Sequence, residues 1–331
     1  MKDQDWVGHT PVMVEEVIEA LAPRAGAVLI DATFGGGGHS KAILAAAPCR
    51  IWAVDCDWDA VERGKKFSRT CEGRLAIFHG HFGDIENLLE SHGIFPVDGI
   101  TFDLGVSSWQ LSLPDRGFSF QQNGPLDMRM NISPGKGALP TAADLLNRDS
   151  EDELADLFSR FGEEPRARHI ASAIVKERRN NPITHTLQLA DLVCSVVGRG
   201  HRVRHPATRV FQALRIAVNG ELGPKGQLTQ GLKAAERLLK PGGRLVVISF
   251  HSLEDREVKQ FMMRRCDKKR ETSRHRPPLP DEARPPSFRL LFRKPRRPSR
   301  AEVERNPRAR SARLRAVERT TSPPWSTAGV A

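Results

Sequence analysis

The sequence lacks the features that would place it in a membrane or outside the cell. No apolar run approaches the roughly 18 residues of a membrane-spanning helix, and residues 1–8 contain no apolar core of a secretion signal. The five cysteines form no C-x-x-C pair, so neither a zinc site nor a disulfide framework is predicted, and no other metal site is expected. We therefore expect a cytoplasmic protein with reduced cysteines.

Acidic residues are scarce in one part of the chain only. The formal net charge of the 331 residues is +11, but residues 259–319 hold 21 Lys/Arg against 7 Asp/Glu, a balance of +14 that leaves −3 for the rest. Such a segment favours a polyanionic partner such as RNA, although a solvated tail has the same composition. Within it, the Arg/Lys/Pro-rich stretch 266–286 is predicted to be a flexible basic loop.

The segment 28–40 combines a short apolar run with four consecutive glycines. Residues 28–31 (VLID) are typical of a buried parallel strand, and the apolar residues after the glycines favour a helix. Glycines let backbone N–H groups approach a ligand closely, and the following helix adds partial positive charge. This pattern predicts the first β-α turn of a doubly wound sheet, where nucleotide-like cofactors bind. A mobile glycine loop is the alternative.

This glycine turn does not have the spacing of a dinucleotide fingerprint. If Gly35 and Gly37 are its first two glycines, Ser40 occupies the third place. Asp55 nevertheless ends a second apolar run, where an acidic residue would accept hydrogen bonds from ribose hydroxyls. A ribose site without a pyrophosphate position favours S-adenosylmethionine (SAM), which has no phosphate. A simple helix cap is the other interpretation of Asp55.

Two further strand ends are predicted to face the same crevice. Strand 75–79 is followed by Phe82, which could stack on a cofactor base or pack in the core. Strand 99–104 contains Asp103 near its end. The loop after Asp103 lacks both the Asp/Asn-Pro-Pro-aromatic motif of many exocyclic amino methylases and a nearby cysteine, which disfavours methylation at carbon 5 of a pyrimidine.

The region after this loop loses the alternation of strands and helices. Three apolar helical patterns follow one another without a strand, at 150–161, 170–175 and 189–197, and Ser150 with Glu153 forms a capping box before the first. We expect an inserted helical domain. It carries basic residues that could contact phosphates or form a solvated face; they are Arg166, Arg168, Lys176, Arg178 and Arg179.

The flanking segments are predicted from caps and apolar runs. Thr10 and Pro11 should cap and open an N-terminal helix. A fifth strand over 244–250 ends at His251, which either faces the crevice or merely binds its loop, and Ser252 with Asp255 should cap the next helix. The last strands are expected at 288–292 and 312–317.

Eight blocks together resemble one known family. In order they are HTPV (9–12), DATFGGGGHS (31–40), DLGVSS (103–108), DRGFSF (115–120), GPLDMRM (124–130), HPATRVFQALRIAVN (205–219), ISFHSLEDR (248–256) and NPRARSARLR (306–315). The sequence resembles the MraW/RsmH family of SAM-dependent methyltransferases, which modify the exocyclic N4 of a cytidine in bacterial small-subunit (16S) ribosomal RNA.

The resemblance implies a Rossmann-like α/β methyltransferase core, residues 1–110 and 205–331, with an inserted all-helical domain, residues 111–204, for RNA recognition. It places SAM on a set of residues of which Asp103 is also the expected catalytic acceptor; they are Gly37, Gly38, His39, Asp55, Phe82, Asp103 and Gln110. Trp109 stands where the family usually has proline. The sequence leaves open whether the substrate is free 16S RNA or the small ribosomal subunit. It also leaves open whether the chain forms a homodimer.

Two other classes of protein share parts of this pattern. A nicotinamide-dependent oxidoreductase would share the glycine turn and Asp55, but it would not account for the basic segment or the missing fingerprint glycine. A non-catalytic RNA-binding protein would account for the basic segment, but not for acidic residues at three strand ends.

Overall fold

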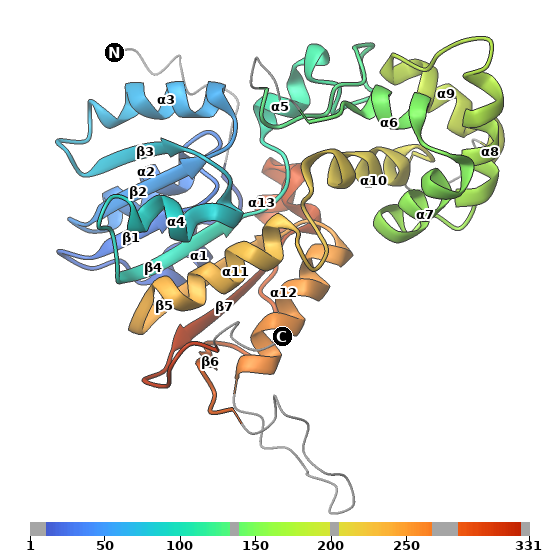
Figure 1. Ribbon diagram of the computed structural model, residues 1–331. Coiled ribbons are helices and arrows are strands. Elements are labelled where there is room, and N and C mark those ends of the chain that lie inside the picture. Colours follow the sequence, from blue (N-terminus) through green and yellow to red (C-terminus); the bar gives the residue numbers. More distant parts are fainter. Residues whose placement is uncertain (1–10, 133–138, 199–204, 267–283, 326–331) are drawn as a thin grey trace, which may run out of the picture. The chain divides into compact units, whose positions relative to one another are not determined.

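The protein is described by a computed structural model that covers residues 11–132, 139–198, 205–266 and 284–325. Most of the predicted loop at 266–286 therefore lies outside the described residues, as does Thr10. The chain divides into two compact units (Figure 1). One comprises Met1–Gly105 and Pro224–Ala331, and the other comprises Val106–Gly223.

The first unit is built on a seven-stranded sheet, counted over the described residues. Its strands are β1 (Val28–Asp31), β2 (Arg50–Asp55), β3 (Leu75–His79), β4 (Val97–Asp103), β5 (Leu239–Ser249), β6 (Phe288–Leu290) and β7 (Arg313–Arg319). Their order is β3-β2-β1-β4-β5-β7-β6. The first five pair in parallel, whereas β7 pairs antiparallel with both β5 and β6. The predicted doubly wound α/β fold is confirmed.

Helices cover both faces of this sheet. On one face, Val17 of α1 (Val14–Leu21) and Ile43 of α2 (Gly38–Ala46) join a buried cluster with Leu29 and Val246. On the other face, α11 (Gln227–Leu238) approaches closely because Gly231 has no side chain: a Cβ there would lie 3.2 Å from the Phe102 ring. The unit also contains α3 (Trp58–Ser68), α4 (Ile85–Glu90), α12 (Ser252–Arg265), α13 (Arg300–Arg305) and the short 3-10 helices η2 (Phe82–Asp84) and η5 (Pro307–Ser311).

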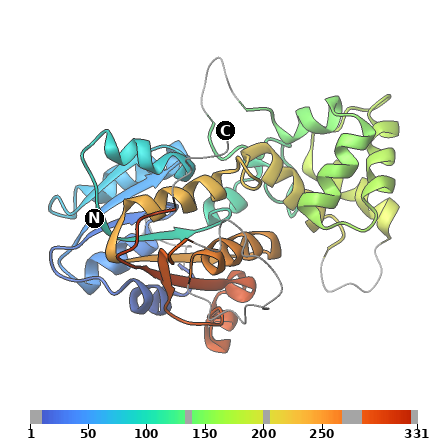
Figure 2. The ribbon, with the colours of Figure 1, turned by 60° about the horizontal axis from the view of Figure 1, so that its bottom comes forward.

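The second unit is helical and has its own core. Its helices are α5 (Ser108–Ser112), η3 (Pro114–Arg116), α6 (Ala142–Arg148), α7 (Glu151–Gly162), α8 (Ala167–Glu177), α9 (Thr186–Val197) and α10 (Thr208–Asn219), and Figure 2 shows the last five gathered side by side. Phe158, Ile174, Val193 and Leu214 are buried at its centre. The predicted Ser150/Glu153 capping box is present at the start of α7.

Helix α10 packs in this second core, because Val210 and Leu214 join the same buried cluster as Phe158. The two units thus meet in the sequence at Gly105 and Gly223, whereas the sequence placed the boundaries at residues 110 and 204. The functional assignment of the two domains stays a prediction.

Two predicted helix starts were wrong, the first by three residues and the second by one. Helix α1 begins at Val14 rather than at Pro11, and its N-cap Met13 has left-handed backbone angles. Helix α12 is capped by His251 with Glu254 rather than by Ser252 with Asp255. The cap moved because Asp255 pairs with two arginines of β7. Strand β5 is also longer than predicted, since it begins at Leu239. Within the described residues, no helix is both long and apolar enough to cross a membrane.

Candidate active site

Three carboxylates end neighbouring parallel strands of the first unit. Asp31 is the last residue of β1, Asp55 of β2 and Asp103 of β4. Asp31 pairs in register with Thr101, and side chains alternate along a strand, so Asp31, Thr101 and Asp103 lie on one face of the sheet. The start of α2 covers this face. The predicted crevice at the carboxyl ends of the strands is therefore lined with acid.

The glycine turn is held in shape by backbone angles and by Asp55. Gly35 (φ 54°) and Gly37 (φ 75°) have left-handed angles that favour glycine. The Gly35 N–H donates to Oδ2 of Asp55 at 2.6 Å, and the Asp57 N–H donates to Oδ1 at 2.9 Å. Burial is the main reason that the pKa of Asp55 rises to about 6. Asp55 thus organises the turn before any ligand binds.

The first helical residue after the turn, Gly38, meets the HTPV block. A Cβ on Gly38 would lie 2.8 Å from Cβ and Cγ of Pro11, so only glycine fits there without displacement. Helix α2 then begins with no side-chain cap on Gly37. Its first N–H groups can therefore receive the carboxylate of an amino acid ligand.

His39 follows this turn, and the residue is only 6% exposed. Its Nε2 lies 2.9 Å from the carbonyl oxygen of Val12, and its Nδ1 lies 3.6 Å from Oδ2 of Asp103, an ion-pair distance. Both ring nitrogens therefore face protein oxygens. His39 can contribute to a cofactor site through its backbone, whereas its imidazole serves the protein itself.

Asp103 keeps one oxygen available. Its backbone N–H donates to Oγ1 of Thr33 at 2.6 Å, which fixes the strand end against the glycine turn. Among the described residues, Oδ1 of Asp103 is buried and has no hydrogen-bond partner. Burial raises the pKa of Asp103 to about 6; His39 lowers it, while Asp31 and Glu254 raise it. An orphaned buried carboxylate oxygen of this kind indicates a missing donor from a ligand.

Sequence reasoning missed the residues that support this site. Oδ2 of Asp31 accepts a hydrogen bond from the Ser40 hydroxyl at 2.6 Å, and burial raises the pKa of Asp31. Glu254 is 2% exposed and belongs to the capping box of α12. The Thr33 hydroxyl accepts a hydrogen bond from the Asp103 N–H, and the Val12 carbonyl contacts Nε2 of His39. The HTPV block was the only signal for Val12, and a motif alone does not state which atom it contacts.

Phe82 and Gln110 have packing roles in the structure. The Phe82 ring meets Phe102 edge-on, with 5.7 Å between ring centroids, and a Cβ on Gly231 would lie 2.9 Å from it. These contacts are on the α11 face of the sheet, opposite to Asp103. Gln110 belongs to the second unit, where its Oε1 accepts from the Ser107 N–H at 2.9 Å in a capping box. Their roles toward SAM stay predictions.

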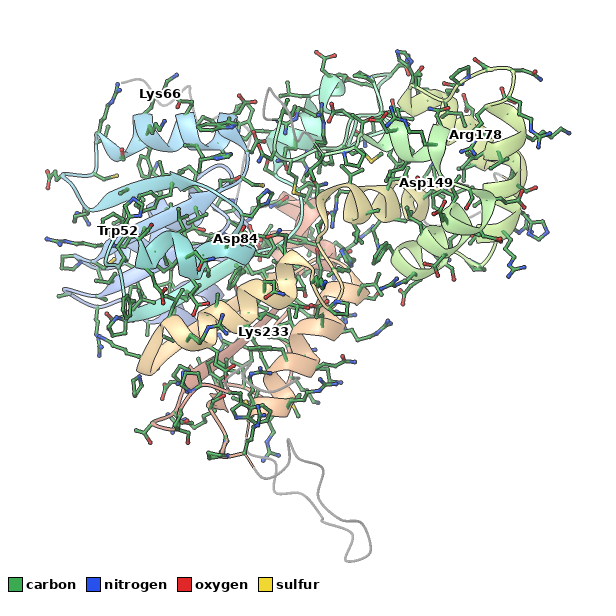
Figure 3. The ribbon with its side chains drawn as sticks, in the orientation of Figure 1. Trp52, Lys66, Asp84, Asp149, Arg178 and Lys233 are labelled. Atoms are coloured by element: carbon green, nitrogen blue, oxygen red, sulfur yellow. The ribbon has the colours of Figure 1, made fainter. Side chains whose placement is uncertain are left out.

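Two of the five basic residues of the helical unit have structural partners. Arg178, labelled in Figure 3, donates from Nη1 to the carbonyl of Leu146 at 2.7 Å, and Arg166 donates to that of Val196 at 3.0 Å. Both carbonyls lie in the last turn of a helix, α6 and α9 respectively, where such groups need donors. These two arginines stabilise the fold.

Several arginines of the basic C-terminal segment also pair with acidic residues. Arg313 and Arg315 each contact Asp255 at 2.7 Å, and Arg289 contacts Glu318 at 2.6 Å. Arg265 pairs with Glu236 at 2.7 Å. These pairs balance part of its formal charge inside the first unit, so net charge overstates what this segment offers to RNA.

Comparison with known proteins agrees with this geometry. Residues 6–320 match the model of the MraW methylase family. The chain belongs to this family. It is 51% identical over 319 residues to the ribosomal RNA small subunit methyltransferase H of Paramagnetospirillum magneticum, covering 96% of this chain and 98% of the relative. The protein of that name from Rhodospirillum centenum is 54% identical over 315 residues, 95% of this chain and 93% of the relative.

Family membership confirms the predicted enzyme class, a SAM-dependent methyltransferase. The residues at the strand ends fit this cofactor. The start of α2, where Gly37 offers no capping side chain, suits its carboxylate, and Asp55 lies at a strand end where a ribose would bind. Oδ1 of Asp103, which has no hydrogen-bond partner among the described residues, suits an N–H donor or a cation. The buried acids suit the positive charge of a sulfonium.

Proposed function

We propose that the protein transfers a methyl group from SAM to the exocyclic N4 of a cytidine in small-subunit (16S) ribosomal RNA. The observation that carries the proposal is the family match over residues 6–320, together with an unpartnered carboxylate oxygen at the fourth strand end. The same site would act in the cytoplasm on RNA or on a ribosomal particle.

Asp103 supplies what the acceptor nitrogen needs. When bound, SAM provides an electrophilic methyl carbon on a positively charged sulfur. The lone pair of the cytosine amine is delocalised into the ring, so the amine is a weak nucleophile. Oδ1 of Asp103 would accept a hydrogen bond from the amine N–H and return electron density to nitrogen. Positioning and this fixed negative charge then account for most of the acceleration.

The target base must be unpaired or flipped for its amino group to reach a strand end. Trp109, Phe118 and Phe120 are the aromatic candidates for stacking on it. In the structure Phe118 is 7% exposed, and Phe120 packs against His205 and Phe211 within the helical unit. These two rings have core partners within the helical unit. Trp109 lies in the first turn of α5 and is the third candidate to test for stacking.

The test of the proposal is transfer of labelled methyl from SAM to three acceptors, followed by nucleoside analysis. The acceptors are free small-subunit RNA, isolated small subunits and whole ribosomes. We expect N4-methylcytidine in at least one of them, and the acceptor that reacts shows at which assembly stage the base is accessible. No transfer to any acceptor by a protein that still binds SAM would overturn the substrate assignment. Sedimentation of the same sample tests whether the chain forms a homodimer.

Binding of SAM is expected to weaken as the pH falls through about 6. Asp55 has a pKa raised to about 6, mainly by burial, so its carboxylate is protonated below that value. A neutral carboxyl is a poorer acceptor for ribose hydroxyls and for the Gly35 N–H. Titration calorimetry across this range should show the loss in the wild type and a flatter profile in Asp55→Asn, whose affinity is low throughout. Because the pKa of Asp103 is also raised to about 6, the comparison of the two proteins decides: the same pH dependence in Asp55→Asn as in the wild type would exclude Asp55 as the titrating group.

A further inference from the structure

The imidazole of His39 has fixed hydrogen-bonding roles. The carbonyl oxygen of Val12 can only accept, so Nε2 of His39 carries a proton and donates to it at 2.9 Å. Nδ1 faces Oδ2 of Asp103 at 3.6 Å. If the ring were neutral and Asp103 ionised, a nitrogen lone pair would face a carboxylate inside a largely buried site. A proton on Nδ1 removes this repulsion and makes the 3.6 Å contact an ion pair rather than a hydrogen bond.

The charges around the pair favour a cation on the ring. Asp31 at the end of β1 and Glu254 in the first turn of α12 both act on Asp103 with negative charge. Asp31 also interacts favourably with His39. His251 in turn lies 2.9 Å from Glu254. Three acids and one facing imidazole therefore share this corner.

The HTPV block fixes the ring at this place. Pro11 packs against Gly38, the residue before His39. The Met13 N–H donates to Glu302 Oε1 at 2.7 Å, which anchors the block to α13. Between these two contacts, the Val12 carbonyl holds Nε2. The block that the resemblance singled out without a role is thus a backbone clamp on His39.

We propose that His39 is a positioning residue: its imidazolium, clamped by the Val12 carbonyl, keeps Asp103 ionised and holds Oδ2, so that Oδ1 stays an acceptor for the substrate amine. The part of this inference that concerns the amine rests on the proposed function. The protonation of the His39 ring is a property of the protein alone and can be measured without cofactor or RNA.

The first experiment is ring-nitrogen NMR of the cofactor-free full chain near neutral pH, with the His39 signals assigned from a His39→Gln sample. We expect two ring N–H signals for His39 in the wild type and the Nε2–H signal alone in Asp103→Asn, which has no negative charge to hold the second proton. A neutral His39 ring in the wild type, with ordinary carboxylate signals for Asp103, would overturn the proposal. This outcome does not depend on which RNA is methylated.

The second experiment is the pH profile of methyl transfer with saturating SAM. Loss of a facing cation raises the pKa of a carboxyl by about 1 to 3 units. In His39→Gln the pH at which activity is lost on the acidic side of the profile should therefore rise by about that amount, with activity recovered at alkaline pH. A purely structural role would lower the plateau and leave that pH unchanged. His92→Gln, which removes an exposed histidine of the same unit, should match the wild type.

Combining the two substitutions checks that His39 acts through Asp103. Asp103→Asn has no titrating group at this position, so adding His39→Gln should cause no further shift of any residual pH profile. An upward shift that persists in the double variant would overturn the proposal, because another group would then be titrating. If the protein methylated no RNA while the NMR result held, the proposed function would fail and the doubly protonated His39 ring would stand.

Discussion

Asp103→Ala should lower the turnover of methyl transfer by about 100- to 1000-fold with saturating SAM, the range found when one preorganised charge-stabilising group is removed. The reason is geometric: Asp103 offers the one carboxylate oxygen at these strand ends that is buried and unpartnered among the described residues. Turnover is measured by labelled methyl transfer to whichever ribosomal acceptor reacts.

The matched control is Asp98→Asn, which changes a carboxylate on the same strand. Asp98 lies near the opposite end of β4, where it accepts from the Val28 N–H at 3.0 Å and pairs with Lys240 at 2.6 Å. This variant should retain turnover even where it loses stability. Full turnover of Asp103→Ala at saturating SAM would remove Asp103 from the chemistry and leave it a cofactor contact.

Glu236→Ala is expected to lower the free energy of unfolding by about 3–5 kcal/mol, the cost of breaking a buried ion pair from one side. Glu236 is 1% exposed and pairs with Arg265 at 2.7 Å. It also accepts hydrogen bonds from the Ser287 hydroxyl and from the backbone N–H of Trp325, the latter at 3.1 Å. Its loss leaves a guanidinium and two further donors buried without their acceptor.

Chemical denaturation of the two proteins side by side measures this effect. Glu304→Ala is the control, because Glu304 forms an exposed pair with Arg300, and such pairs contribute about 0–1 kcal/mol. Glu236→Gln keeps the volume and part of the hydrogen bonding, so its loss should be smaller than that of Glu236→Ala. Equal stability of Glu236→Ala and Glu304→Ala would mean that the buried network contributes nothing.

The sequence predicted the strands and the acidic residues of the site better than the contacts between its side chains. Apolar runs that end in Asp31, Asp55 and Asp103 located the strands and placed three acids at one edge, because parallel strands end together. The contact between His39 and Asp103 could not be predicted in this way, since it joins residues 64 positions apart, and a carbonyl of a third segment contacts the other ring nitrogen. Side-chain types alone do not show which nitrogen faces which oxygen.

Two other differences have physical causes of the same kind. Ser252 and Asp255 have the spacing of a capping box, but Asp255 binds Arg313 and Arg315, so the cap moved one residue to His251. Helix α10 has an apolar face that would fit either unit, and only its packing against Phe158 shows which core it joins. Long-range pairing decided both outcomes.

The position of β7 between β5 and β6 imposes an order on biosynthesis. Strands β1 to β4 leave the ribosome first, but β5 follows only after the 118 residues of Val106–Gly223, a continuous stretch with its own core that can fold as it emerges. The outer edge of β5, which carries buried Val246 and Ile248, then stays open until residues 313–319 are made. A chain shortened before β7 would expose this apolar edge to other strands and be prone to aggregate.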